Sequence, residues 1–335
     1  MPLHDPESDR IFANRAVHKY SSTVSAMKNR NVLVFHQGAL GDLVLTFPAL
    51  LPLRNAGKGM DAICQGKLGK LAFHLHMFDT CFPLESAMSA SIWSDPSDAD
   101  TRVRHLLASY DLILVFSFSR QLEDTIRKIS QGTVFRIPPR PPVHQRIHVT
   151  QFIWDQLAVY GLLQAGKFVF QDKKREKVYS SKRILIHPGS GSPRKNWHLD
   201  RFISVYESLK SEGMDAEFII GPAEDFLAKK LGNRPAHCAS DLTAVSEMMK
   251  NAAGFIGNDS GLSHLAGFLG LPVSVIFGPS DPIRWKPVGN VRVLRPADLK
   301  CTPCFETEKE NCADPACLDR ISADMAVCMV REITG

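Results

Sequence analysis

One stretch decides the fold of this chain: the run Asn31-Val32-Leu33-Val34-Phe35, followed closely by Gly38-Ala39-Leu40-Gly41-Asp42. The first run is apolar and rich in β-branched and aromatic side chains, which is typical of a buried parallel strand. The glycines permit a tight turn, and the apolar content of residues 42–54 predicts a helix that packs on the sheet. Backbone N–H groups at such a helix start favour anions, so they suit the carboxylate of Asp42 as well as a phosphate. An acid at the carboxyl end of a first strand is well placed to act as a general base facing a bound substrate.

Two other interpretations of this stretch compete with a catalytic role for Asp42. Aspartate is a preferred N-cap residue, so Asp42 could serve only to start the helix. A dinucleotide-binding fingerprint is the weaker alternative, because the run lacks the full G-x-G-x-x-G spacing. The second strand, near residues 61–64, also ends without the acid that would hold a ribose. The cap interpretation therefore stays open beside the general base.

Length and composition describe a globular protein with room for two domains. The chain has 335 residues, of which 44% are hydrophobic and 22% are charged, and this argues against disorder. The 40 basic and 35 acidic residues give a net charge of +5, which permits an anionic substrate or membrane surface but does not argue for nucleic acid. No apolar run reaches the roughly 18 residues needed to span a bilayer, and the first ten residues do not resemble a signal peptide. We therefore expect a cytoplasmic protein without a transmembrane segment.

Five of the eight cysteines crowd the end of the chain. Cys301, Cys304, Cys312 and Cys317 follow a C-x2-C-x7-C-x4-C pattern, with Cys328 beyond it. A four-thiolate zinc site is one interpretation, but the second pair lacks the usual short spacing. Disulfides would be unusual in a cytosolic chain. Reduced thiols or a redox-sensitive loop are the favoured interpretation, and no metal is expected.

Strands and helices alternate along the first half of the chain, which predicts a parallel, doubly wound sheet. Residues 1–29 are interpreted as an extension or a leading helix. The strands are expected at 31–36, 61–64 and 111–116, and the helices at 42–54, from about 121, and at 148–163. The proline-rich stretch 137–142 should be irregular, and the charged residues 173–177 should form an exposed linker.

The second half repeats this alternation. Its strands are expected at 183–187, 217–220, 254–256 and 273–277, and its helices from about 200, at 242–250 and at 260–269. We therefore expect a Rossmann-like N-terminal domain over 30–172 and a Rossmann-like C-terminal domain over 173–335. Ligands should bind in a cleft at the carboxyl ends of the strands.

An anion site is predicted between a strand and a helix at Gly257-Asn258-Asp259-Ser260-Gly261-Leu262-Ser263-His264. Asp259 can cap the helix, while the N–H groups of Ser260, Gly261 and Leu262 point toward a ligand. His264, one turn into the helix, could donate to a phosphate or be a buried structural histidine. A well-capped helix without a ligand is the alternative for the whole motif.

Two further side chains should converge on the same edge. The loop His187-Pro188-Gly189-Ser190-Gly191 leaves a strand and delivers Lys195, a cation that could offset the charge of a diphosphate. Glu224, just after Gly221-Pro222, could accept hydrogen bonds from ribose hydroxyls. Together these residues predict a nucleotide-diphosphate site without a metal requirement.

Six motifs, in order and at compatible spacing, resemble those of the ADP-heptose:lipopolysaccharide heptosyltransferase family, glycosyltransferase family 9. The resemblance runs from about residue 31 to 333. The motifs are Gly41-Asp42 with Pro48-Ala49-Leu50, His187-Pro188-Gly189, Lys195-Asn196-Trp197, Gly221-Pro222-Ala223-Glu224, Asp259-Ser260-Gly261-Leu262-Ser263-His264 and Phe277-Gly278-Pro279-Ser280-Asp281-Pro282.

This resemblance implies a GT-B fold, with the acceptor bound N-terminally and the sugar nucleotide C-terminally, and an inverting transfer with Asp42 as base. One departure is the loop His36-Gln37-Gly38-Ala39-Leu40, where many relatives carry small hydroxyl residues. The implied donor contacts are Lys195 and Ser190 to the diphosphate, Glu224 to the ribose, Asp259 to the sugar hydroxyls, and Ser260, Gly261 and Leu262 to the phosphates.

The predicted function is transfer of a heptose from ADP-heptose to an inner-core lipopolysaccharide acceptor, without a cofactor. The acceptor would be an anionic glycolipid, met in the cytoplasm or at the inner face of the cytoplasmic membrane. Candidate acceptor contacts are Gly41, Arg136 and Arg140, and His144 and Arg146 are further candidates for the same contact. The alternatives are a GT-B enzyme that uses another nucleotide sugar, either a transferase or an epimerase-hydrolase, and a non-catalytic nucleotide-sugar-binding protein.

Overall fold

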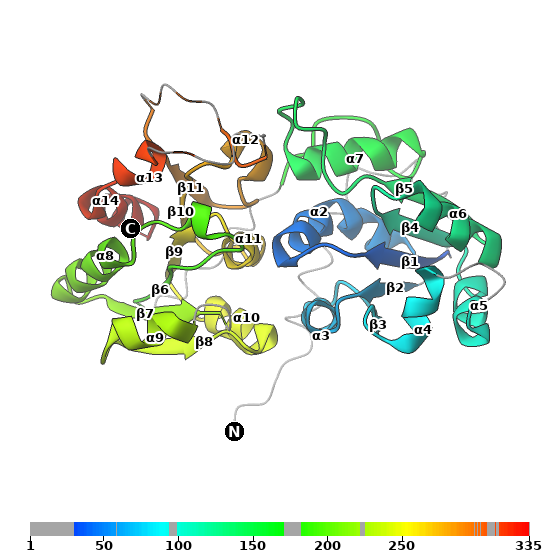
Figure 1. The fold of residues 1–335 in the computed structure, drawn as a ribbon, viewed down its shortest axis with the longest axis horizontal. Coiled ribbons are helices and arrows are strands. Elements are labelled where there is room, and N and C mark those ends of the chain that lie inside the picture. Colours follow the sequence, from blue (N-terminus) through cyan, green and yellow to red (C-terminus); the bar gives the residue numbers. More distant parts are fainter. Residues whose placement is uncertain are drawn as a thin grey trace. The chain divides into compact units, whose positions relative to one another are not determined.

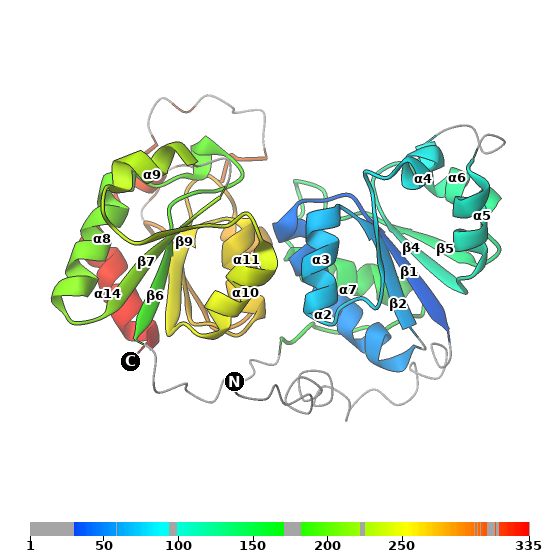
Figure 2. The ribbon, with the colours of Figure 1, turned by 90° about the horizontal axis from the view of Figure 1, so that it is seen from below.

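The computed structural model describes residues 30–57, 59–93, 99–170, 182–221, 225–297, 299, 301, 303–306, 312 and 315–334. These residues form two compact units. The first contains the described residues of 30–38, 46–141 and 149–169, and the second those of 39–45, 142–148 and 170–335. Each unit is a parallel sheet covered by helices on both faces, as Figures 1 and 2 show.

The sheet of the first unit has the strand order β3-β2-β1-β4-β5, and its pairings are parallel. β1 lies in the centre, with Val34 opposite Ala62 on one side and Leu114 on the other. Because the chain runs outward first to β2 and then to β4, the strand order reverses beside β1, where ligands of such sheets bind. The strands are β1 (Asn31–His36), β2 (Gly59–Cys64), β3 (Cys81–Pro83), β4 (Leu112–Phe116) and β5 (Thr133–Ile137).

Helices on both faces explain why residues 32–35 of β1 are all apolar and buried. Leu33 and Phe35 join the core beneath α5 and α6, whereas Val32 and Val34 are buried on the opposite face. Figure 2 shows α2, α3 and α7 on one side of this sheet and α4, α5 and α6 on the other. The helices are α2 (Leu40–Ala56), α3 (Gly66–His74), α4 (Ala87–Ala90), η3 (Ser91–Trp93), α5 (Thr101–Ala108), α6 (Arg120–Ile129) and α7 (Val149–Val159).

The sheet of the second unit has the order β11-β10-β9-β6-β7-β8, again with parallel pairings. Its order reverses between β6 and β9, so the loops after these two strands share one edge. The strands are β6 (Arg183–His187), β7 (Asp215–Ile220), β8 (Ala236–Cys238), β9 (Gly254–Asn258), β10 (Val273–Ile276) and β11 (Val291–Leu294).

The main core of the second unit lies between this sheet and α8, α9 and α14, with α10 and α11 on the other face (Figure 2). Trp197 is almost fully buried there, and its ring meets that of Phe202 edge-on at 4.9 Å. Its indole N–H donates to the Ile321 carbonyl at 3.2 Å. The helices are η5 (Pro193–Lys195), α8 (Leu199–Ser211), α9 (Asp225–Leu231), α10 (Leu242–Lys250), α11 (Gly261–Phe268), α12 (Pro282–Trp285), α13 (Ala316–Asp319) and α14 (Ala323–Thr334).

The predicted strands that begin at residues 31 and 183 are confirmed, and so is the helix at 242–250. The helix expected from residue 42 begins two residues earlier, and the helix expected at 148–163 ends at Val159. β5 was not predicted, because its short, half-exposed sequence runs directly into the prolines. The predicted extension over 1–29, the linker at 173–177 and Glu224 lie outside the described residues. None of the described helices is long and apolar enough to cross a bilayer.

Candidate active site

The carboxylate of Asp42 lies in the first turn of α2. Its Oδ2 accepts a hydrogen bond from the N–H of Ala39 at 3.1 Å, and the Leu43 N–H donates to the Ala39 carbonyl at 3.0 Å. Ala39 therefore occupies the cap position, and Asp42 reaches back to it from the third helical position, as in a capping box. The interpretation of Asp42 as the N-cap is wrong by this geometry, because Leu40 and Gly41 are already helical.

The loop that leads to Asp42 is fixed by side chains of the first unit. The Gly38 N–H donates to Nδ1 of His36 at 3.2 Å, and the Gln65 side-chain amide donates to the Gly38 carbonyl at 3.2 Å. His36 is completely buried, and this burial lowers its pKa from 6.5 to about 4. The imidazole is thus neutral near pH 7 with Nδ1 as acceptor, while its Nε2 has no hydrogen-bond partner among the described residues. Sequence reasoning noted this loop but missed His36 and Gln65 as its supports.

Lys195, Asp259 and His264 form a cluster in the second unit. Nζ of Lys195 lies 3.2 Å from Oδ2 of Asp259, and Nε2 of His264 lies 3.7 Å from Oδ1. Burial by itself would raise the pKa of Asp259, but the hydrogen bond from His264 and the charge of Lys195 hold it below its usual value. The cluster therefore keeps one carboxylate ionised between two nitrogen groups at the edge where β6 and β9 end.

The start of α11 provides backbone donors beside this cluster. Ser260 is the N-cap, and its Oγ accepts from the Ser263 N–H at 3.3 Å. The prediction that Asp259 caps this helix is wrong, since its carboxylate is engaged by Lys195 instead. The N–H groups at the first two helical positions, Gly261 and Leu262, have no intrahelical acceptor and lie at the positive end of the helix dipole. They can bind an anion.

The first turns of α2 and α11 pack against each other within the second unit. A Cβ added to Gly261 would lie 2.9 Å from Cβ of Leu40, and one added to Gly41 would lie 3.0 Å from Cδ2 of His264. Both distances are too short for a larger residue without movement, so glycine permits the close approach. This contact brings the turn that carries Asp42 next to His264.

Asn258 organises the loop that carries Lys195, a role that the sequence analysis did not assign. Its Oδ1 accepts from the Trp197 N–H at 3.0 Å, and its Nδ2 donates to the Pro188 carbonyl at 2.8 Å. Ser190 belongs to the same loop and hydrogen-bonds locally, with Oγ 2.6 Å from Oδ1 of Asn196. The signal for Asn258 was an amide at the end of an otherwise apolar buried strand, where a polar group needs partners.

The candidate acceptor residues divide between the units. Arg136 and Arg140 belong to the first unit, whereas Gly41 belongs to the second. Nε of Arg136 donates to Glu123 at 3.0 Å. The guanidinium of exposed Arg140 lies 5.6 Å from the ring centroid of Phe118, which is itself 56% exposed. Arg140 therefore presents a cation and an aromatic ring together at the surface.

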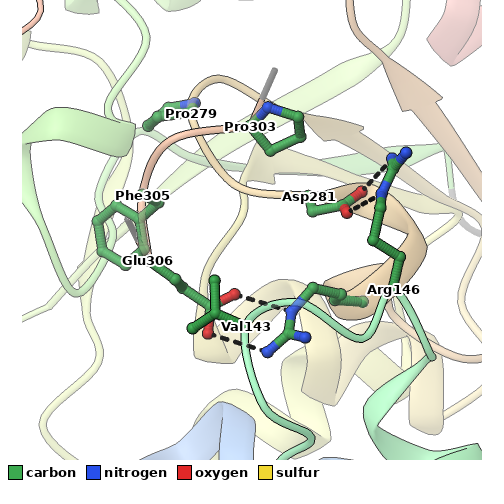
Figure 3. A pocket seen from close by; sticks show the side chains of 8 residues that line it. Val143, Arg146, Pro279, Asp281, Pro303, Phe305 and Glu306 are labelled. Atoms are coloured by element: carbon green, nitrogen blue, oxygen red, sulfur yellow. Dashed lines mark hydrogen bonds and ion pairs between the residues drawn. The ribbon is translucent and has the colours of Figure 1, made fainter. Parts of the chain in front are cut away.

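A pocket lies in the second unit beside the loop at Pro279, and Figure 3 shows side chains that line it. Two ion pairs line it. Arg146 donates to Asp281 at 2.7 Å, and Arg284 donates to Glu306 at 2.9 Å. Arg146 was a candidate for the acceptor, but this pairing occupies its guanidinium. The exposed His144 belongs to the same unit.

None of the four clustered cysteines at positions 301, 304, 312 and 317 forms a disulfide within the described part of the chain. Among the residues that the structure describes, which include these four, no group of three or more His, Cys, Asp or Glu side chains is placed to hold a metal ion.

Comparisons with known proteins agree with this architecture. Residues 159–313 match the family model of glycosyltransferase family 9 (heptosyltransferase). Lipooligosaccharide heptosyltransferase 2 of Campylobacter jejuni is 25% identical over 283 residues, which are 80% of this chain and 87% of that protein. Lipopolysaccharide heptosyltransferase 3 of Escherichia coli K12 is 28% identical over 113 residues, which are 31% of this chain and 33% of that protein.

Solved structures extend the likeness to nearly the whole chain. A family 9 glycosyltransferase from Veillonella parvula is 17% identical, with a TM-score of 0.72 and coverage of 92% of this chain and 98% of that one. Heptosyltransferase WaaC of Escherichia coli with ADP is 16% identical, with a TM-score of 0.65 and coverage of 90% and 99%. At these identities the structures show the fold, and they confirm the predicted GT-B class of two Rossmann-like domains.

Proposed function

This chain belongs to glycosyltransferase family 9, the heptosyltransferases, and we propose that it transfers a heptose from ADP-heptose to an inner-core lipopolysaccharide acceptor with inversion. It is a glycosyltransferase; the donor, the acceptor and the stereochemistry are the proposed part. The observation that carries the proposal is the Lys195–Asp259–His264 cluster beside the start of α11, whose first N–H groups have no intrahelical acceptor. The names of the relatives, two of which act on lipooligosaccharide or lipopolysaccharide, support the acceptor class.

The donor diphosphate would bind at the start of α11. The N–H groups of Gly261 and Leu262 suit phosphate oxygens, and Ser260 completes this turn. The ammonium of Lys195 and the imidazole of His264 would face the negative charge of the diphosphate. Asp259 would hold both groups in place and contact the sugar hydroxyls. As the bond from the sugar to the diphosphate breaks, these groups stabilise the negative charge on departing ADP. In this proposal they take the place of a divalent cation, and Glu224 and Ser190 stay predicted contacts to the ribose and the diphosphate.

Asp42 would be the general base. One of its carboxylate oxygens is held by the Ala39 N–H, which leaves the other to accept the proton from the acceptor hydroxyl. The acceptor oxygen then attacks the anomeric carbon on the face opposite the diphosphate, so the configuration inverts. The packing of Gly41 against His264 supports this role, because it places the base and the donor cluster in one unit.

The acceptor would be an anionic glycolipid at the inner face of the cytoplasmic membrane. Arg136 and Arg140 are its proposed cationic contacts, and Gly41 gives it close access to the helix start. Arg140 is the better candidate for contact with the acceptor, because its side chain is exposed whereas Arg136 is paired with Glu123.

Transfer assays test the proposal. The enzyme is incubated with ADP-heptose or with UDP-sugars, each with truncated lipopolysaccharide acceptors, and the products are identified by mass spectrometry. We expect transfer from ADP-heptose alone, with the opposite anomeric configuration in the product. Transfer from a UDP-sugar but not from ADP-heptose contradicts the donor, and release of free sugar without acceptor indicates an epimerase-hydrolase instead.

A further inference from the structure

The short segment Pro303-Cys304-Phe305-Glu306 lies inside the cysteine-rich stretch and is anchored to the second unit on both sides of Phe305. The N–H groups of Cys304 and Phe305 donate to the Pro279 carbonyl at 2.9 and 3.1 Å. Glu306 accepts from Arg284 at 2.9 Å and from the indole of Trp285 at 2.8 Å, and Arg284 is itself only 2% exposed. Figure 3 shows Phe305 and Pro279 on the same side of the pocket. The position of the Phe305 ring is thus set by the backbone and by a buried charge.

The ring of Phe305 faces two cations of η5, Arg194 and Lys195. Nζ of Lys195 lies 5.1 Å from the ring centroid, and the guanidinium carbon of Arg194 lies 5.5 Å from it. Both distances are within the roughly 6 Å at which a cation is attracted to an aromatic face. Lys195 also contacts the Asp259 carboxylate at 3.2 Å. Its ammonium therefore has an aromatic face and a carboxylate as neighbours.

Lysine has a flexible four-carbon stem, so its charge is well placed only where the surroundings restrict it. Here the Lys195 side chain is 15% exposed. The carboxylate of Asp259 attracts the ammonium but is also the group with which a diphosphate would compete. The Phe305 ring attracts the same ammonium without occupying its hydrogen-bonding protons. It can therefore hold Lys195 in place while those protons turn to a ligand.

We propose that Phe305 is a positioning residue for donor binding, whose ring holds the Lys195 ammonium where it meets the diphosphate of the nucleotide sugar. This inference rests on the proposed function, and it assigns the cysteine-rich segment a role in donor binding. The ring acts through Lys195 and touches no reacting atom. A side chain of similar volume without a π face would fill the same space but would not attract the cation.

ADP affinity measured by calorimetry tests the proposal in four variants. Phe305→Leu removes the π face, Phe305→Trp retains it, Lys195→Met removes the cation, and the fourth combines Phe305→Leu with Lys195→Met. We expect Phe305→Leu to weaken ADP binding about two- to fivefold, the factor that corresponds to an exposed or half-buried cation–π contact. Phe305→Trp should restore the wild-type affinity. In the Lys195→Met background, Phe305→Leu should have no further effect.

Thermal unfolding of the same variants separates positioning from folding, because a purely structural role lowers stability equally with and without Lys195. If Phe305→Leu weakens ADP binding equally with Lys195 and with Met at position 195, or does not weaken it at all, the positioning role of Phe305 is wrong. The proposed donor is not affected by either result. If the wild-type protein does not bind ADP at all, both this inference and the proposed donor are wrong. The assay needs neither the sugar nor the acceptor, so its result is independent of those parts of the proposed function.

Discussion

The Nζ atom of Lys195 lies 3.2 Å from the Oδ2 atom of Asp259, although 64 positions separate the two residues in the chain. Lys195 follows β6 and Asp259 follows β9, and these neighbouring strands end at the same edge of the sheet. The side chains are 15% and 7% exposed. Each therefore depends on the other to offset the cost of burying a charge.

Asp259→Asn should lower the free energy of unfolding by about 3 kcal/mol, because it leaves a buried ammonium without its carboxylate. Urea unfolding followed by circular dichroism measures this loss. Asp215→Asn is the matched control, since Asp215 pairs with Lys210 at the surface and such a pair contributes at most about 1 kcal/mol. Equal losses in the two variants would contradict the dependence of Lys195 on Asp259.

Asp42→Asn should reduce turnover by a factor of about 10² to 10⁴, the usual contribution of a positioned general base. The amide oxygen of asparagine can still accept from Ala39, so the helix start and the ADP affinity should change little. Asp200→Asn provides the control, because Asp200 is an exposed acid in the first turn of α8. Retention of more than about a tenth of wild-type turnover in Asp42→Asn would exclude this residue as the base.

Lys195→Met should weaken ADP binding by about ten- to a hundredfold, which corresponds to the loss of a hydrogen bond to a charged group. Transfer by the wild-type enzyme should persist in excess EDTA, since the proposed charge stabilisation comes from side chains and a helix start. Lys210→Met, a surface lysine, should leave the affinity unchanged. Full inhibition by EDTA that magnesium reverses would show that the reaction needs a metal ion.

His36 should make the stability of the protein fall as the pH drops from about 6.5 to about 4. Its folded pKa is about 4 against 6.5 for an unperturbed histidine, so between these values the unfolded chain binds a proton that the folded protein does not. Stability therefore rises with pH across this window, by up to about 3 kcal/mol. Urea unfolding at several pH values should show a shallower dependence for His36→Gln. Parallel curves for the two proteins would mean that His36 does not titrate in this way.

The elements that the sequence predicts best are those buried on both sides. Residues 32–35 of β1 and 184–186 of β6 are unbroken apolar runs, and such runs identify a covered parallel strand from the sequence alone. β8 was missed because its three residues are all exposed, so burial leaves no hydrophobic pattern there. Asp42 lies in the first turn of α2, after β1, and Lys195 lies in η5, after β6. Their roles stay predictions.

What could not be predicted are contacts that depend on the strand order. The pairing of Lys195 with Asp259 decides that Ser260 rather than Asp259 caps α11, and local sequence favours both residues equally as caps. In the sequence, Phe305 lies in a stretch whose prominent feature is its cysteines. The contact of its ring with Lys195 exists only in the folded chain. These contacts are set by topology, which the residue pattern does not specify.

The buried guanidinium of Arg284 also binds backbone carbonyls of Pro142 and Gln145, although the strand before them and the helix after them belong to the first unit. Neither unit is therefore a continuous piece of the gene. A single recombination crossover near residue 170 would join residues 170–335 to a foreign segment 142–148, whose backbone would have to present two carbonyls to Arg284 in the same positions. Recombination between related genes should thus be tolerated best when residues 142–148 and the C-terminal half come from the same parent. These seven residues therefore tie the evolution of the two halves of the gene together.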